Sequence, residues 1–416
     1  MEKFNLIFPS IAAVIFVWAA TAYHYVNTGA SIGLWMLLLF ILWFVWKKPN
    51  LQAWKFPKYL IPAMIILYGG IILSTFFHMN DMKNWSGGYY SVVGFLRCTL
   101  PLFALWMVGR IRDVRKPVFW TLTAIIYAIC LFSLYQIIIT HGGRPVSFYR
   151  TPHVTTMVLT LMLPFSAAFG VYYFNNSLYK WVSWCVIPFA FIVLYFADVR
   201  GAIMGVVGAG IVCGIPLYIQ FRKRISAKKL CLLVLAFFAV GSILLGQAIE
   251  GGWNRSGEIR VGDRYYMWEA SCQIWQDHPI AGVGINNWMK TYESEKYYPP
   301  QAKEHGHDHP HNVFVYFFAS AGVIGGAAYI MYCLSMLAVF VTWIRKKAED
   351  PMAWAILFAF IAMTVQGMVD CNFIFKLVAR TFYMLLAAAL VFSLWREKDR
   401  IVSGEKSIKK DQETGV

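Results

Sequence analysis

The chain has few charged side chains and especially few acidic ones. Charged residues make up 14% of its 416 residues, with 21 Asp and Glu against 37 Lys and Arg, while 59% are hydrophobic. Soluble domains carry roughly a quarter charged residues. A soluble globular class is therefore excluded, and the sequence predicts an all-α polytopic membrane protein.

Patterns typical of structural metal or disulfide sites are also missing. The 8 cysteines include no Cys-x-x-Cys pair, which excludes a zinc ribbon or a disulfide framework. One bridge, between Cys272 and Cys371, stays open because both residues are expected to face outward. The chain has no Asp-x-Asp pair for a divalent ion that bridges a sugar nucleotide. We expect no metal and no cofactor.

Long apolar runs dominate the chain. About 20 apolar residues cross a membrane as a helix, and about twelve such runs are present. They cover 5–23, 31–46, 59–77, 89–109, 118–139, 153–174, 181–197, 202–219, 230–249, 311–343, 352–369 and 377–395. The predicted organisation is transmembrane helices 1–9 in 1–249, a large outward loop in 250–310, transmembrane helices 10–12 in 311–395, and a tail in 396–416.

The net charge of +16 is explained by membrane topology. Basic residues collect in cytoplasmic loops of membrane proteins, and counting spans between the basic clusters puts every cluster on one side. The clusters are Lys47–Lys58, Arg110–Lys116, Arg222–Lys229, Arg345–Lys347 and Arg396–Lys410. Both termini are therefore expected in the cytoplasm, and no nucleic-acid partner is needed.

A histidine-rich stretch, His-Gly-His-Asp-His-Pro-His-Asn over 305–312, precedes the tenth span. Imidazole can hold or release a proton near neutral pH. Pro310 fits the first turn of a helix, which would place His311 in the opening turn at the membrane surface. The alternative is that these histidines are simply solvated loop residues.

A zinc site is a second reading of this stretch. Alternation would point four imidazoles to one side of an extended strand, namely those of His305, His307, His309 and His311. Zinc sites usually combine ligands from separate elements, however, and Pro310 interrupts the strand. We therefore favour a proton-transfer site.

The following apolar run, 311–343, is too long for one upright crossing. It would reach about 50 Å as a helix, against roughly 30 Å of hydrocarbon. It must tilt, project beyond the membrane, or break near Gly322–Gly326. The glycines could instead serve close helix packing.

The outward loop contains a predicted helix over 263–277, capped by Asp263. An aromatic stripe at three- and four-residue spacing would lie along the membrane interface. The stripe consists of Tyr265, Trp268, Cys272 and Trp275. Arg264 is thereby placed at the helix start near the lipid headgroups, and a tight turn follows over 278–284.

Cationic side chains collect on the same outward face. They are Arg144, Arg150, Arg200, Arg264, Lys376 and Arg380, accompanied by His309, His311 and Asp370. Arg200 could pair with Asp198, but an arginine at the membrane edge is a functional hypothesis by default. Arginines grip phosphate oxygens, and a neutral histidine can act as a general base. A lipid-linked diphosphate is the anion expected here, and arginines could stabilise it as a leaving group without a metal.

These motifs resemble the O-antigen ligase and polymerase superfamily. His311-Asn312, nine residues and then Gly322-x-x-Gly325 resembles the ligase histidine motif. Arg200 to Met204 resembles the ligase Arg-x-x-x-Leu motif, with Met in place of Leu. The helix that begins near Arg264 resembles the loop helix of the family. Asp370 and Lys376 resemble its late Asp and basic residue, with Lys where Arg is expected.

The resemblance implies about twelve transmembrane helices and one large periplasmic loop that contains short amphipathic helices. It implies an inverting, metal-independent transfer of O-antigen polysaccharide from undecaprenyl diphosphate to the lipid A-core, at the periplasmic face of the bacterial inner membrane. His311 would be the base, and Arg200 and Arg264 would hold the diphosphate. Substrate-binding roles are expected for His309, Arg144, Arg150, Asp370, Lys376 and Arg380.

Three competing functions remain open. An O-antigen or capsule polymerase uses the same donor, but polymerases tend to have two sizeable periplasmic loops. A protein O-glycosyltransferase often adds a soluble C-terminal region, whereas this chain ends in a short tail. A secondary transporter would hold its charges at the midplane, but here they gather at one rim. The oligomeric state cannot be deduced.

Overall fold

The computed structural model describes residues 2–21, 26–54, 56–78, 82–149, 151–221, 262–302 and 305–414. These residues form α-helices and one short 3-10 helix, without a strand among them. The all-helical prediction is therefore confirmed for the part of the chain that the structure describes.

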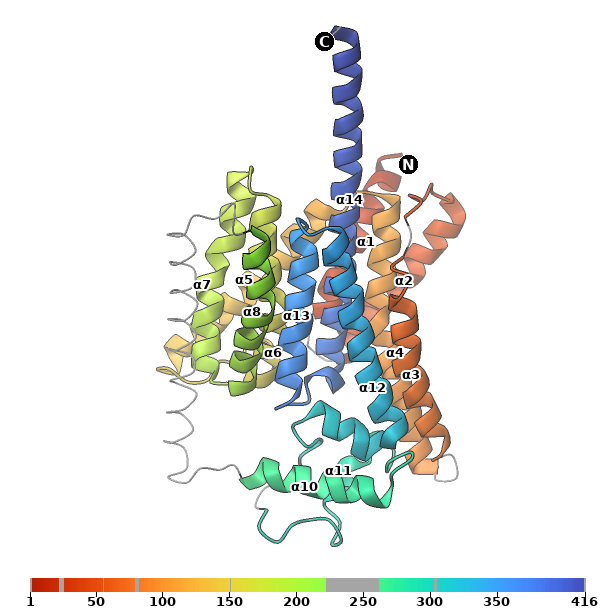
Figure 1. Ribbon diagram of the computed structural model, residues 1–416, viewed down its shortest axis with the longest axis vertical. Coiled ribbons are helices and arrows are strands. Elements are labelled where there is room, and N and C mark those ends of the chain that lie inside the picture. The colour runs from red at the N-terminus through yellow and green to blue at the C-terminus, as the bar shows by residue number, and fades with distance from the viewer. Residues whose placement is uncertain are drawn as a thin grey trace.

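Upright helices form a bundle, and two short helices cross one end of it (Figure 1). The upright helices are α1 Glu2–Thr21, α2 Val26–Lys47, α3 Leu60–Phe76, α4 Met82–Ile111, α5 Arg115–Ile139, α6 Pro152–Tyr172, α7 Ser177–Ala197, α8 Arg200–Phe221, α12 Val313–Lys346, α13 Pro351–Gly367 and α14 Lys376–Thr414. The crossing helices are α10 Gly262–Asp277 and α11 Trp288–Tyr292, and the 3-10 helix η1 is Asn372–Ile374. Both chain ends lie opposite α10 and α11 (Figure 1).

Each expected span coincides with an upright helix except 230–249, which lies outside the described residues. Among the described residues, 6 helices are long and apolar enough to cross a membrane: α5, α6, α7, α8, α12 and α14. Shorter apolar helices occur in α1, α2, α3 and α13. The chain is thus a multi-pass membrane protein, and the total of twelve spans stays a prediction.

The bundle is built around α6 and α14. Their apolar windows are 89% buried, against 33% for those of α7 and α8, so the first two helices are central and the last two peripheral. Helix α14 packs on α4, α13 packs on both α6 and α8, and α12 packs on α3. This arrangement brings the ends of α6, α8, α12, α13 and α14 together at the end of the bundle where α10 lies.

Helix α12 is broken at Gly322, whose backbone has φ 64° and ψ −162°. The turn 279–284 fills the break with backbone hydrogen bonds. The amides of Val283 and Gly284 donate to the carbonyls of Ala319 and Ser320 at 3.1 and 2.8 Å, and that of Val323 donates to Pro279 at 2.8 Å. The broken helix thus keeps its polar groups satisfied, and the expected break near Gly322 is present.

The predicted start of α12 was wrong by a few residues. The helix begins at Val313, because the Asn312 side chain accepts hydrogen bonds from the amides of Phe314 and Val315 at 3.0 and 3.1 Å. Asparagine is among the strongest N-cap residues, so it sets the start in place of Pro310. His311 therefore precedes the helix and does not lie in its opening turn.

One further expectation needs correction. Cys272 and Cys371 are both free thiols, so the bridge between them is absent. Helix α14 continues beyond its apolar part through residues 396–414, and the cytoplasmic location of this tail stays a prediction.

Helix α10 is present over the predicted range, but it begins at Gly262, so Asp263 lies inside the helix and is not its cap. Its protein-facing side also differs from the aromatic stripe. The buried positions are Met267, Ala270, Ser271 and Ile274, whereas Tyr265 is 56% exposed. The indole nitrogen of Trp268 donates to the carbonyl of Pro310 at 2.7 Å. The stripe therefore flanks the buried face, and one of its members fixes the chain just before His311.

We predict that Gly322→Ala destabilises the fold by roughly 2–4 kcal/mol, through a positive φ and steric overlap. A Cβ at Gly322 would lie 2.2 Å from the carbonyl oxygen of Ile280. The measurement is thermal unfolding of the purified protein. The matched control is Gly214→Ala in α8, where no heavy atom lies within 4 Å of the added Cβ. Equal melting temperatures for the two variants would contradict the account of the break.

Candidate active site

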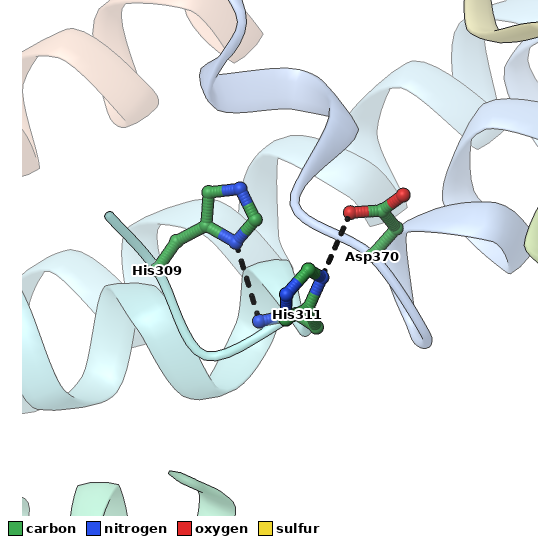
Figure 2. Close-up of side chains that lie close together, drawn as sticks. All are labelled: His309, His311 and Asp370. Carbon is green, nitrogen blue, oxygen red and sulfur yellow. Dashed lines mark hydrogen bonds and ion pairs between the residues drawn. The ribbon is translucent and has the colours of Figure 1, made fainter. Parts of the chain in front are cut away.

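The site centres on Asp370, in the connection between α13 and α14. The residue is 3% exposed and lies between two histidines from distant parts of the chain. Its Oδ2 atom is 3.2 Å from Nδ1 of His153, at the start of α6, and its Oδ1 atom is 3.4 Å from Nδ1 of His311 (Figure 2 shows the second pair). Oδ1 also accepts a hydrogen bond from the Cys371 amide at 2.8 Å.

Asp370 stays an ionised carboxylate because of these neighbours. Burial alone would raise the pKa of Asp370, but the interactions with His153 and His311 outweigh it and hold the pKa well below its usual range. A buried carboxylate with such partners is a stable negative charge beside two imidazoles. It can therefore orient a histidine and stabilise the imidazolium form.

His311 is held in a strained conformation beside this carboxylate. Its backbone φ is 51°, in the left-handed region, where a non-glycine residue is held only by its surroundings. The 3.4 Å approach of Nδ1 to Asp370 is an ion-pair distance, but the pair does not meet hydrogen-bond geometry, and Nδ1 is buried without a hydrogen-bond partner among the described residues. Catalytic hydrogen bonds are often long in the unliganded state and tighten on substrate binding.

The amide of Asn312 fixes the neighbouring backbone from both sides. Besides capping α12, its Nδ2 atom donates to the carbonyl of Met368 at 2.9 Å. The start of α12 is thereby tied to the residues that follow α13, two positions before Asp370. This link sets the separation of His311 and Asp370 independently of the side-chain contact.

His309 supports His311 as a neutral ring. Its Nδ1 atom accepts a hydrogen bond from the His311 amide at 3.3 Å, so Nε2 carries the proton of the neutral ring (Figure 2). Burial, followed by the proximity of His311, lowers the pKa of His309 to about 4. The ring also packs edge-on against Phe375, with centroids 5.6 Å apart.

Two of the predicted arginines, Arg264 and Arg200, lie on elements that meet at Val369, next to Asp370, and a third contacts the end of α7. Nη1 of Arg264 donates to the Val369 carbonyl at 2.8 Å. Arg200 begins α8, and a Cβ added to the next residue, Gly201, would lie 2.9 Å from the Val369 side chain. Nε of Arg144 donates to the carbonyl of Ala197, in the last turn of α7, at 2.8 Å. Arg264 is thus bonded to the connection that carries Asp370, and the first turn of α8 packs against that connection.

Arg200 differs from Arg264 and Arg144 in making no hydrogen bond or ion pair with any residue that the structure describes. Its side chain is exposed, and it makes no ion pair with Asp198 within the residues that the structure covers. Asp198 adopts a left-handed conformation at the end of α7, with φ 49°. The alternative of a local salt bridge is therefore not supported, and the guanidinium is open to an anionic ligand.

The remaining predicted residues have other surroundings. Nε of Arg380 donates to the carbonyl of Ala20 at 3.0 Å, at the end of α1. Lys376 is exposed and lies against α4, with its Cε 2.6 Å from a Cβ built on Gly94. Arg150 lies outside the described residues. Lys376 does not pair with Asp370, which contacts the two histidines instead.

Sequence reasoning missed His153. It lies in the first turn of α6, which is capped by the Thr151 side chain and begins with Pro152. These two residues mark a helix start, and a histidine in that turn was the available signal. Nothing in the sequence pattern connects it with Asp370, which lies 217 positions away.

Ligand atoms of His309, His311 and Asp370 lie within 4.8 Å of one another and could in principle hold a metal ion. Most of these atoms already have partners, because Nδ1 of His309 accepts the His311 amide and both Asp370 oxygens are engaged. The four-histidine zinc reading is not supported either. The His305 ring stacks on Tyr298 with centroids 4.4 Å apart, in the loop. The contacts favour a proton-transfer site.

The fold and the site together define a multi-pass helical membrane protein with an imidazole–carboxylate centre at one end and Arg264 bonded to the residue beside it. A comparison with protein families matches residues 185–330 to the family described as O-antigen ligase. The chain therefore carries an O-antigen ligase domain, and the resemblance inferred from its motifs is confirmed. The matched region includes Arg200, Arg264 and His311, whereas His153 and Asp370 lie outside it. A comparison with curated proteins found no match.

We predict that burial of His309 makes stability fall as the pH drops. The pKa of about 4 in the fold lies below the ordinary 6.5, so between these values the unfolded chain binds a proton that the folded chain does not. At pH 5 the free energy of unfolding is therefore lower than at neutral pH by about 2 kcal/mol. His309→Asn should remove this part of the loss, and His305→Asn is the control. The melting temperature at pH 7.5 and at pH 5 tests this, and an unchanged pH dependence in His309→Asn would contradict it.

Proposed function

We propose that the protein transfers an O-antigen polysaccharide from undecaprenyl diphosphate to the lipid A-core. The observation that carries this proposal is the ionised Asp370 beside His311, with Arg264 bonded to the adjacent residue. Such a centre combines a proton acceptor with cations for a diphosphate. The matched O-antigen ligase domain supports a donor and an acceptor of this kind.

His311 acts as the general base. Asp370 holds the proton on Nδ1 and leaves Nε2 free to accept the proton of the attacking core hydroxyl. The hydroxyl oxygen forms a bond to the anomeric carbon as the bond from that carbon to the diphosphate oxygen breaks. The electron pair leaves with the diphosphate, and attack from the opposite face inverts the anomeric configuration.

Arginines stabilise the leaving diphosphate. Arg200 is exposed and without a fixed partner among the described residues, whereas Arg264 keeps one nitrogen on the Val369 carbonyl. Guanidinium groups keep their charge at a membrane edge and bind phosphate oxygens in pairs. Arg144 extends this cationic surface from the end of α7, and Arg150 belongs to the same proposed set. His309 positions the backbone of His311, and no metal takes part.

The proposed location is the bacterial inner membrane, with the site in the periplasm and both termini in the cytoplasm. The basic clusters of the sequence support this orientation. The segment that contains α10 and α11 is then periplasmic, as expected for 250–310. A polymerase that uses the same donor is the alternative, since the same centre could serve a different acceptor.

We predict that His311→Ala abolishes ligation, because the acceptor hydroxyl loses its base. Lipopolysaccharide from the native host should show bare core, while long lipid-linked glycan accumulates. His305→Ala is the matched control, because this exposed ring stacks on Tyr298 away from the carboxylate, and it should leave lipopolysaccharide unchanged.

Two other outcomes decide against the proposal. Core that carries a single repeat unit would identify a polymerase. Unchanged lipopolysaccharide in His311→Ala, at a normal level of protein in the membrane, would remove the proposed base.

A further inference from the structure

A polar pocket lies at the opposite end of the bundle from the histidines. It has a volume of about 510 Å³ and is formed where α12 ends, α13 begins and α14 leaves the apolar region. Its walls carry both cations and carboxylates. The proposed glycan transfer uses none of these groups.

Two of the wall carboxylates are already neutralised by wall cations. Nζ of Lys347 is 2.5 Å from Oε2 of Glu397, and Nη2 of Arg400 is 3.7 Å from Oε2 of Glu349. The remaining charged groups of the pocket wall take no part in these two ion pairs. They are one carboxylate and two cations, which come from the end of α12, the start of α13 and the middle of α14.

The unused carboxylate is that of Asp350, which is only 5% exposed. Its Oδ1 atom caps α13 by accepting the Met352 amide at 3.1 Å. Its Oδ2 atom, and Oγ of the 4% exposed Ser393, are buried without hydrogen-bond partners among the described residues. The Ser393 hydroxyl lies near enough to the Asp350 carboxylate to oppose the rise in the pKa of Asp350 that burial causes. The pair nevertheless does not meet hydrogen-bond geometry. Buried acceptors of this kind call for a donor.

The unused cations are Lys346 and Arg396. Lys346 is exposed and lacks an ion-pair partner in the described ranges. Arg396 donates through Nη1 to the carbonyl of Glu349 at 2.9 Å, and its guanidinium carbon lies 5.5 Å from the centroid of the Tyr172 ring. These contacts fix the guanidinium at the pocket wall, and its other nitrogens make no hydrogen bond or ion pair within the described residues. The pocket thus offers a buried negative site next to a positive rim.

We propose that this pocket binds the phosphoethanolamine head group of a membrane phospholipid. The ammonium group donates to Asp350 and Ser393, and the phosphate contacts Lys346 and Arg396. A purely anionic head group leaves the buried acceptors unsatisfied and repels the carboxylate. A quaternary choline group has no N–H to donate, so a primary ammonium is required.

The position of the pocket favours a lipid over a soluble ligand. Lys346 is the last residue of α12, and Asp350 directly precedes the first residue of α13. Residues at the ends of membrane-spanning helices lie at the level of the lipid head groups. A bound lipid there would hold the end of α12, the start of α13 and the middle of α14 together.

The experiment is native mass spectrometry of the full chain, purified in detergent, with equal amounts of phosphatidylethanolamine, phosphatidylcholine and phosphatidylglycerol. We expect the amount of retained phosphatidylethanolamine to exceed that of each other lipid roughly tenfold. The reason is that the other two lipids cannot donate a charge-assisted hydrogen bond to Asp350. Asp350→Asn should remove this preference. Asparagine still caps α13, so the fold is kept, and an unchanged melting temperature checks this.

Asp399→Asn is the matched control. This carboxylate lies on the same part of α14 but pairs with Arg115 at 2.7 Å, outside the pocket, so the variant should keep the preference. Equal retention of phosphatidylglycerol, or an unchanged preference in Asp350→Asn, would overturn the proposal. Binding of free phosphoethanolamine without retention of the lipid would overturn the membrane source.

Discussion

The end of the bundle where α10 lies depends on one buried carboxylate. An ionised Asp370 without partners would be strongly destabilising in such a place, and the chain supplies two imidazoles from opposite sides, His153 from α6 and His311 from the loop before α12. The carboxylate therefore fixes three helix ends to one another. The bonds of Asn312 and Arg264 to Met368 and Val369 add to the same junction. Positioning of the proposed base and packing of the helices are consequences of one interaction.

The break in α12 has a related role. In a straight helix the turns before and after Gly322 would share one axis. The break at Gly322 lets the turns from Val313 to Ala321 run in a different direction from the rest of α12. The turn 279–284 is bonded into the break through the backbone. The segment with α10 and α11 is thus joined to the helix that follows His311 by main-chain hydrogen bonds, which do not depend on side-chain identity. Only glycine fits at the break, because of its positive φ and the nearby carbonyl of Ile280.

Local features of the sequence predicted much of this structure. Apolar runs located the upright helices, the three- and four-residue spacing located α10, and the excess length of 311–343 indicated the break. The start of α12 was missed because two local signals compete, Pro310 at a first turn and Asn312 as a cap, and the side-chain hydrogen bonds of the cap decide between them. Pairings between distant segments were beyond reach.

The hydrogen bond between Asp370 and His153 and the one between Arg380 and Ala20 each join residues more than two hundred positions apart. Hydropathy and spacing carry no information about such pairs, because they report only on neighbours along the chain. The same limit applies to the arginines. Their residue type and outward location were predictable, but only the fold shows that Arg264 and the start of α8 meet at Val369 whereas Arg380 is engaged by α1.

The most direct test of the central claim is the rate of glycan transfer by purified Asp370→Asn, from undecaprenyl diphosphate to a core acceptor. Asparagine keeps the size of the side chain and the oxygen that accepts the Cys371 amide, but it removes the charge that supports an imidazolium at His311. The account predicts a rate lower by roughly a hundredfold or more, with the melting temperature near that of the wild type. A folded variant that transfers glycan at the wild-type rate would contradict it.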